Sequence, residues 1–521
     1  MSIRCTTLTS NPAIMFAKEE LLKYTQQVQE PITYSFVLGL DQDFIENGLI
    51  EQSLFNNDPA VDAFHFIQKE REIYIIGSNT RSVLYGVYHL CKNMFGYKWV
   101  HFLSKEKIGY KDVQFISSEI HSGSMVRRGL VIENYSDIPF LTKLIDWAAK
   151  HYINELFFTF MLWDKVKHVI EEEINKRGLS ITIGGHSMHY LLMESSVSEK
   201  KQIDFSNDSW KVTLVDKIKN YCEESTSIKR VSLWPADIGI NDNQDFLARY
   251  IEFTELIKRE IPSIEVEHIA YNAGLSWNML ELHEGLSGSS KVNTLFAFWG
   301  RNYKQSFLKE ERAFEALQKW CQKTKVNQQD ITIFEYYSDH YMLGDLFPPL
   351  FHRIHEDIDV YAKLGIKSMV NLIVPYITKE DEKSLDQHFP WESLQLMNSY
   401  YFARLTWGDD FHEIEADFYS IFDDHQISTK QLLVKLESVL SEVSKWNVPL
   451  FPSRVIDPEK VVQHEAISEI ITDLTKWKRE LVPFKVDSTT EIKDPNSLIS
   501  FYMDHVCEKL DDLLRTWRGK E

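Results

Sequence analysis

Two acidic residues, Asp237 and Glu335, follow apolar runs that are typical of buried strands. Glu335 comes after residues 331–334, a β-branched and aromatic run, and Asp237 comes shortly after residues 230–234. Cleavage of a glycosidic bond needs an acid that protonates the leaving oxygen and a second group that attacks or stabilises the anomeric carbon. Two carboxylates that face each other across one pocket can fill both roles. Asp237 and Glu335 are therefore the candidate catalytic residues.

Both acids also have a structural interpretation. Glu335 could pair with a nearby Arg, because structural ion pairs also place carboxylates at strand ends. Asp237 could cap the helix that follows it, because Asp is favoured at that position. The catalytic interpretation is favoured because nearly every other predicted strand also ends in a ring or a hydrogen-bonding side chain.

The other predicted strand ends supply the candidate substrate-binding residues. Flat aromatic faces can stack on sugar rings, and polar groups can bind sugar hydroxyls, although each ring is about as well explained by core packing. The candidates are His186, His189, Trp234, Tyr271, Asn272, Trp299, Arg301, Tyr336 and Tyr337. Together they predict a pocket that binds an oligosaccharide.

His186 and His189 also raise the question of a metal site. Gly184 and Gly185 precede them and would let the backbone approach a ligand closely. However, the two histidines lack the HExxH spacing, and no acid follows at a fixed distance. We therefore expect no metal and no other cofactor, and we expect both histidines to contact substrate hydroxyls.

The elements that must position these residues form a regular alternation from Met125 onward. Predicted strands cover residues 129–133, 155–160, 180–183, 230–234, 265–270, 294–298, 331–334 and 368–373. Predicted helices cover residues 138–150, 165–176, 209–224, 244–260, 277–283, 309–324, 349–364 and 391–405, and the fifth has the weakest pattern. Eight such units predict a (β/α)8 barrel over residues 125–408, in which chemistry lies where the strands end.

The segments on either side of the predicted barrel have different patterns. Residues 1–120 predict a small α/β domain, with strands at 34–40, 63–68 and 72–77 and a helix at 81–95 that Gly96 ends. Residues 409–521 predict helices only, at 411–422, 429–446, 458–481 and 495–518. Apolar residues recur at helical spacing in this region, which favours a bundle that closes one side of the barrel.

Charge and cysteine usage limit the partners. The net charge of −20 argues against binding to nucleic acid or to an anionic membrane. The five cysteines are scattered and never form a CxxC pair, which fits reduced thiols. The N-terminus lacks the continuous apolar stretch of a signal peptide, and no run approaches the length of a spanning helix. We therefore expect a cytoplasmic protein without a membrane partner, and a homo-oligomer is left open.

Several motifs resemble a known group of proteins. Residues 77–88 (GSNTRSVLYGVY) and 95–99 (FGYKW) resemble the small domain that precedes the barrel in hexosaminidases and α-glucuronidases. Residues 184–186, Asp237 and residues 335–337 are similar to the bacterial domain-of-unknown-function 4838 group. That group includes glycoside hydrolase family 163, which contains endo-β-N-acetylglucosaminidases that act on N-glycans.

The resemblance implies a glycoside hydrolase that cleaves oligosaccharides, with β-N-acetylglucosaminide linkages as the expected target. The substrate acetamido group could itself be the nucleophile, which is a known exception to the scheme with two carboxylates. Family members that attack intact glycans are secreted, so the missing signal peptide favours imported oligosaccharides. One alternative is an exo-acting α-glucuronidase-like enzyme that binds a uronate through Arg301. Another is a non-catalytic carbohydrate-binding protein on the same scaffold.

Overall fold

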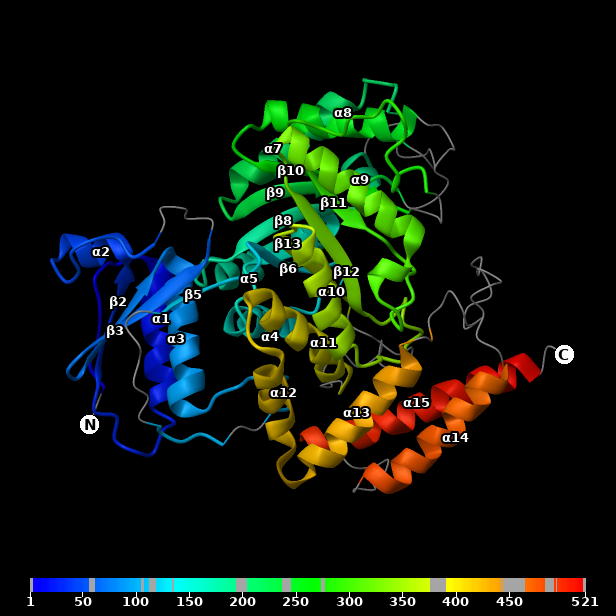
Figure 1. Cartoon of the computed structure of the whole chain (residues 1–521). Coiled ribbons are helices and arrows are strands. Elements are labelled where there is room, and N and C mark those ends of the chain that lie inside the picture. The colour runs from blue at the N-terminus through cyan, green and yellow to red at the C-terminus, as the bar shows by residue number, and fades with distance from the viewer. Residues whose placement is uncertain are drawn as a thin grey trace.

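A computed structural model of the chain shows a small sheet, a closed barrel and a group of helices in that order (Figure 1). It describes residues 3–55, 61–104, 107–111, 119–133, 135–193, 203, 205–236, 245–272, 277–374, 390–441, 443, 464–482, 492 and 494–518. The predicted order of a small α/β region, a (β/α)8 barrel and a helical C-terminal region is confirmed. The boundaries at residues 120, 125 and 408 stay predictions.

The N-terminal region is a five-stranded mixed sheet with helices packed on it. Its strands are β1 (Cys5–Thr7), β2 (Ser35–Leu40), β3 (Ala63–Lys69), β4 (Glu72–Gly77) and β5 (Ile120–Ser122), in the order β1-β2-β4-β3-β5. Its helices are α1 (Pro12–Thr25), α2 (Asp41–Glu46) and α3 (Thr80–Phe95). Asn79 caps α3 by accepting from the Ser82 amide, and Gly96 ends it with a φ of 83°. The expected strands and the expected helix are therefore all present.

The barrel contains all eight predicted strands, and every neighbouring pair is parallel. They are β6 (Arg127–Ile132), β7 (Glu155–Thr159), β8 (Ser180–Gly185), β9 (Ile228–Leu233), β10 (Glu265–Tyr271), β11 (Asn293–Ala297), β12 (Ile331–Asp339) and β13 (Ser368–Val374). The sheet closes because β13 pairs with β6. The largest difference from expectation is β12, which continues to Asp339 instead of ending at Phe334.

In the described part of the barrel region, seven long helices follow the strands, and they cover the barrel (Figure 1). They are α4 (Ile138–Lys150), α5 (Phe160–Asn175), α7 (Lys211–Glu224), α8 (Asp245–Glu260), α9 (Glu311–Asn327), α10 (Phe351–Lys363) and α11 (Pro390–Trp407), and α6 (Met188–Leu191) is a short addition.

The helix expected at residues 277–283 is wrong, because the described residues 277–292 form bends, short turns and irregular backbone. The Leu280 carbonyl accepts from the Trp320 indole at 2.7 Å, and just after the expected range Gly285 and Gly288 have φ angles of 89° and 68°, which no α-helix allows, so no helix continues through them.

A charged layer fills one end of the barrel interior. The Arg127 guanidinium contacts Glu155 at 2.5 Å and Glu267 at 2.7 Å, and it donates to Thr332 at 3.0 Å. These four side chains come from β6, β7, β10 and β12, and all are buried. Because strand side chains alternate between the two faces of a sheet, this layer identifies which residues of each strand point inward.

The C-terminal region contains α12 (Phe411–Tyr419), the 3-10 segment η4 (Ser420–His425), α13 (Gln426–Leu440), α14 (His464–Leu481) and α15 (Pro495–Arg518). Figure 1 shows α13, α14 and α15 lying together beside the barrel. The parts of the expected helices at residues 444–446 and 458–463 lie outside the described residues. No helix in the described part of the chain combines the length and the apolar character needed to cross a membrane.

One buried carboxylate joins the N-terminal sheet to the barrel. Asp62 accepts from Arg81 at 2.6 Å and from Asn79 at 2.9 Å within its own region, and from Arg128 at 2.6 Å and Asn154 at 2.8 Å in the barrel. Burial alone would raise the pKa of Asp62, but the charges of Arg81 and Arg128 outweigh it and lower this pKa to about 2. Asp62 is therefore an ionised link between the two regions.

Candidate active site

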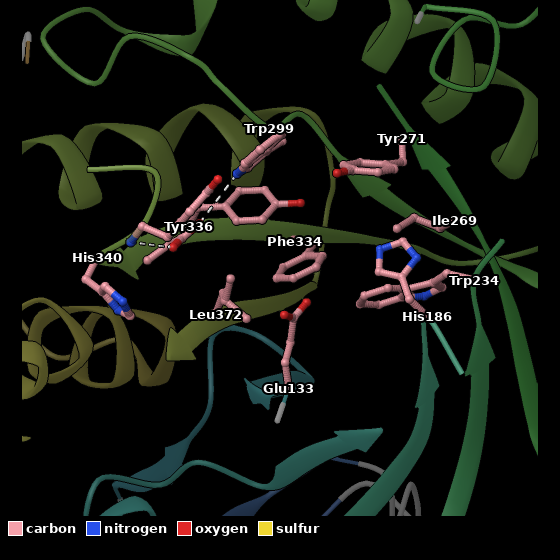
Figure 2. Close-up of a pocket in the computed structure, with 12 residues that line it drawn as sticks. Glu133, His186, Trp234, Ile269, Tyr271, Trp299, Phe334, Tyr336, His340 and Leu372 are labelled. Atoms are coloured by element: carbon pink, nitrogen blue, oxygen red, sulfur yellow. Dashed lines mark hydrogen bonds between the residues drawn. The ribbon is translucent and has the colours of Figure 1, made fainter. Parts of the chain in front are cut away.

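A pocket of about 320 Å³ lies at the C-terminal mouth of the barrel (Figure 2). Carboxylates, imidazoles and aromatic rings form its walls, and apolar side chains from three strands form part of its surface. The lining residues are Glu133, His186, Trp234, Ile269, Tyr271, Trp299, Phe334, Tyr336, Asp339, His340, Tyr341 and Leu372. Five of them, namely His186, Trp234, Tyr271, Trp299 and Tyr336, are residues that the sequence predicts for substrate binding.

The alternation of the strands explains why these residues face the pocket. Glu267 of β10 points inward in the charged layer, so Ile269 and Tyr271 lie on the same face and reach the pocket. On β6, Arg127 points inward, and six residues further along the same face comes Glu133. Glu133 thus continues the inner face of its strand, and Figure 2 shows its carboxylate pointing into the pocket.

A bulge in β12 brings a second carboxylate into the pocket. Thr332 points inward in the charged layer, and Phe334 and Tyr336 follow on the same face. The pairing with β13 then shifts between Glu335 and Ser338. The Ser338 hydroxyl lies 2.9 Å from Ser399 of α11, outside the barrel, and Asp339 returns to the inner face.

Asp339 is held by donors on both carboxylate oxygens. Its Oδ1 accepts from the backbone amides of Tyr341 at 2.9 Å and Met342 at 3.2 Å, and its Oδ2 accepts from the Trp299 indole at 3.4 Å. The rings of Trp299 and Tyr341 stack with their centroids 6.5 Å apart. This one carboxylate therefore fixes the turn after β12 and one aromatic wall of the pocket.

Tyr336 lies close to both pocket carboxylates. Burial raises the pKa of its phenol well above the ordinary value, and Tyr271 and the charges of Asp339 and Glu133 raise it further. The hydroxyl therefore stays protonated, and it can donate a hydrogen bond to a sugar oxygen. Figure 2 shows the rings of Tyr336 and Tyr271 on the side of the pocket opposite the Glu133 carboxylate.

His186 and Trp234 form another wall. The Nδ1 atom of His186 lies 2.6 Å from the Pro235 carbonyl, so Nδ1 carries the proton of the neutral ring and Nε2 is an acceptor. The imidazole packs edge-on against Trp234, with centroids 5.2 Å apart, and the Trp234 indole donates to Ser232 at 2.9 Å. An accepting imidazole beside a ring face suits a sugar hydroxyl, as the sequence predicts for His186.

The structure does not bring Glu335 or Arg301 into this pocket. Arg301 contacts Glu335 at 2.8 Å and Asp357 of α10 at 2.9 Å, and Glu335 also accepts from Tyr303 at 2.8 Å and from Tyr361 of α10. All these side chains are buried. Since Thr332, Phe334 and Tyr336 point inward, Glu335 must point outward toward α10. The sequence interpretation placed it at a strand end, whereas β12 continues for four more residues.

Three other candidates also lie away from the lining of the pocket. The Tyr337 hydroxyl donates to Asp357 at 3.1 Å, outside the barrel. Asn272 is buried and bonds both backbone groups of Trp299, at 2.7 and 2.8 Å, so it supports a wall without lining it. His189 lies on α6 and is partly exposed. Asp237 lies outside the described residues, and its catalytic role stays a prediction.

Glu133, Asp339, His340 and Tyr341 are not among the site residues predicted from the sequence. A signal for Glu133 existed, because it ends the predicted strand at 129–133. The inward turn of Asp339 depends on the bulge, for which the sequence has no clear mark. No group of three His, Cys, Asp or Glu side chains within the described ranges is placed to share a metal ion, and the expectation of no metal stays a prediction.

Comparisons with known proteins give neighbours in structure only. No protein-family model matches the sequence, and no curated protein matches it. A family GH115 4-O-methyl-α-glucuronidase with specificity for decorated arabinogalactans has a TM-score of 0.62 at 12% identity, with 98% of this chain and 72% of that chain covered. A GH138 enzyme targeting pectin rhamnogalacturonan II has a TM-score of 0.61 at 12% identity, covering 98% and 69%. CpGH84D has a TM-score of 0.50 at 10% identity, covering 100% and 87%.

These structural neighbours are glycoside hydrolases, and the likeness shows that this chain has the barrel fold on which such enzymes are built. Sequence identities of 10–12% carry no information about the reaction or the sugar. The similarity to the domain-of-unknown-function 4838 group and to glycoside hydrolase family 163 therefore stays a prediction.

Proposed function

We propose that this protein is a glycoside hydrolase whose substrate sugar binds in the pocket at the mouth of the barrel. The observation that carries the proposal is the meeting of two carboxylates, Glu133 and Asp339, with aromatic rings in one pocket at the C-terminal ends of the strands. Rings that stack on sugar faces, together with a pair of acids, are the parts that glycosidic cleavage needs.

The surroundings of the two acids suggest different roles for them. Asp339 accepts from two backbone amides and an indole, which suits a carboxylate that stays ionised and stabilises positive charge at the anomeric carbon. Glu133 shares the pocket with the apolar side chains of Phe334 and Leu372 and is the better candidate for the proton donor. Asp237 follows β9 and stays a further candidate for either role.

The lining of the pocket supports a neutral sugar. None of its described lining residues is Lys or Arg, and Arg301, the candidate for binding a uronate, is held by Glu335 and Asp357. An oligosaccharide with a β-N-acetylglucosaminide linkage is such an uncharged substrate. If its acetamido group is the nucleophile, one carboxylate protonates the leaving oxygen and the other orients the amide.

The test is hydrolysis of a panel of nitrophenyl glycosides and reducing oligosaccharides, including β-N-acetylglucosaminides and glucuronides. Glu133→Gln and Asp339→Asn keep the shape of each side chain and remove its acid–base function. Each variant should lose about 10²–10⁴-fold in kcat with the best substrate. Glu281→Gln, on a partly exposed residue that is paired with Arg312 and does not line the pocket, is the matched control and should keep the parent rate.

Turnover within a few-fold of the parent rate in both folded pocket variants would contradict the proposal. Binding of sugars without hydrolysis of any panel member would instead identify a carbohydrate-binding protein. Preference for glucuronides would identify the α-glucuronidase-like alternative and would contradict the inference drawn from the lack of Lys and Arg among the described lining residues.

A further inference from the structure

The loop after β12 combines pocket residues with an unusual backbone. Asp339 ends β12, His340 and Tyr341 open the loop, and all three line the pocket. A few residues later, Gly344, Asp345 and Phe347 have φ angles of 66°, 59° and 47°. Residues with side chains rarely adopt this left-handed conformation, so Asp345 and Phe347 must be held there by their surroundings.

The C-terminal helix α15 supplies those contacts from the other end of the chain. The Tyr502 hydroxyl lies 3.1 Å from the Leu346 carbonyl and 2.7 Å from the Phe347 carbonyl. His505 Nε2 lies 2.6 Å from the Asp345 carbonyl, and it is the donor because a carbonyl only accepts. Tyr502 is three residues before His505, so both side chains lie on the same face of the helix.

A third contact from α15 is ionic. Lys509 binds the Asp345 carboxylate at 3.0 Å, and the exposed fraction of that carboxylate side chain is only 9%. Asp345 is thus bound through its carbonyl by His505 and through its side chain by Lys509. Asp345 is one of the two residues with unfavourable backbone angles. Both interactions therefore stabilise the part of the loop that most needs it.

The strained part of the loop is connected directly to the pocket. The Asp345 amide donates to the His340 carbonyl at 2.8 Å, which closes the turn that contains the pocket residues. The His340 ring stacks on Phe347, with centroids 6.2 Å apart and planes 22° apart. Movement of Asp345 or Phe347 would therefore shift His340 in the pocket wall.

Phe347 also packs against a ring from another element. Trp391, at the start of α11, stacks on it with centroids 5.3 Å apart, and His505 packs edge-on against Trp391 at 4.5 Å. The exposed fraction of Phe347 is 6%, and that of Trp391 is also 6%. Rings from α11 and α15 therefore enclose the residue whose ring supports His340.

We propose that Tyr502 and His505 of α15 are positioning residues for the pocket. They hold the loop after β12 in the conformation that presents Asp339, His340 and Tyr341 to the substrate. The inference rests on the proposed function, since it names residues that position that same site. It gives the C-terminal region a part in catalysis in addition to covering one side of the barrel.

The test removes single donors from α15. Tyr502→Phe deletes only the hydroxyl, and His505→Ala deletes the donor to Asp345, whereas the side-chain amide of His505→Gln can replace it. With the best glycoside of the panel, Tyr502→Phe and His505→Ala should each lower kcat/KM by at least about tenfold, because a hydrogen bond to a strained turn is lost. His505→Gln should recover most of the rate. Tyr419→Phe, on a buried tyrosine of α12 that packs on Phe418, is the matched control.

Hydrogen exchange gives a readout that does not depend on any activity. Peptides that cover residues 340–350 should exchange at least about fivefold faster in Tyr502→Phe and His505→Ala than in the parent, with the barrel strands unchanged. Unchanged exchange in this loop would overturn the positioning role even if the enzyme is active. Faster exchange without activity on any glycoside would support the positioning role and contradict the proposed function. A loss of rate that His505→Gln does not recover, with unchanged exchange, would also overturn the inference.

Discussion

At the scale of single residues, the strand face on which a carboxylate lies determines whether it lines the pocket or joins a buried ion-pair cluster. Glu133 and Glu335 both lie near the mouth of the barrel, but Glu133 faces the pocket and Glu335 faces α10. Behind the barrel wall, Glu335 and Asp357 share the guanidinium of Arg301. Burial raises the pKa of Asp357 to about 6; Arg301 opposes this shift, and the charge of Glu335 adds to it. Arg353 also lies 3.8 Å from Asp357, but Arg301 is the cation that both acids contact, so the cluster should be sensitive to the loss of Arg301.

Replacing Arg301 should therefore destabilise the fold strongly. In Arg301→Met, Glu335 and Asp357 would be buried without their shared cation, which should cost about 3–5 kcal/mol in the free energy of unfolding. Urea unfolding followed by circular dichroism measures this change. Arg312→Met is the control, because Arg312 and Glu281 are 57% and 30% exposed and their pair should contribute about 0–1 kcal/mol. If both variants lose the same free energy of unfolding, the buried cluster stabilises the fold no more than the exposed ion pair does.

At the scale of elements, most of the barrel could be predicted and most of the pocket could not. Eight apolar runs alternating with amphipathic segments indicate the eight strands, because both periods are local properties of the sequence. β1 and β5 are only three residues long and leave no period to detect. The inward turn of Asp339 depends on a bulge against β13, and the loop after β12 is fixed by residues about 160 positions away. Such tertiary contacts have no local pattern.

The role of Gly184 in the structure differs from the role that the sequence suggested. The sequence suggested that its missing side chain lets a ligand approach, but a Cβ atom there would lie 1.8 Å from the Ser232 carbonyl oxygen of β9. Gly184→Ala should therefore separate β8 from β9, displace His186 and cost at least about 1–3 kcal/mol in the free energy of unfolding. Thermal and urea unfolding test this.

Gly109→Ala is the matched control for that substitution. The nearest atom to a Cβ at Gly109 is 3.8 Å away, so this variant should unfold like the parent. If Gly184→Ala also unfolds like the parent, the close approach of β8 to β9 does not limit the fold.

At the scale of the whole molecule, the contact between the N-terminal sheet and the barrel depends on ionised Asp62. Its partners Arg81 and Arg128 belong to the two regions it joins, and its carboxylate is fully buried. Arg81 also donates to the Gly178 carbonyl at 3.3 Å, just before β8. The same cluster therefore ties α3, β6 and the segment before β8 together, and its protonation should affect the molecule as a unit.

Asp62 should make the stability of the protein depend on pH in the acid range. Its folded pKa of about 2 lies below the value near 3.9 of an unfolded Asp, so its contribution is complete above about pH 5 and is lost as the pH falls through about 2. At pH 7 the parent should exceed Asp62→Asn by about 2–3 kcal/mol in the free energy of unfolding, and this difference should shrink between about pH 4 and pH 2. Urea unfolding at a series of pH values measures this difference.

Asp208→Asn, on an acid that is 85% exposed, is the control and should follow the parent at every pH. A difference for Asp62→Asn that stays constant down to the lowest pH at which the parent folds would show that shape, and not charge, makes this contact.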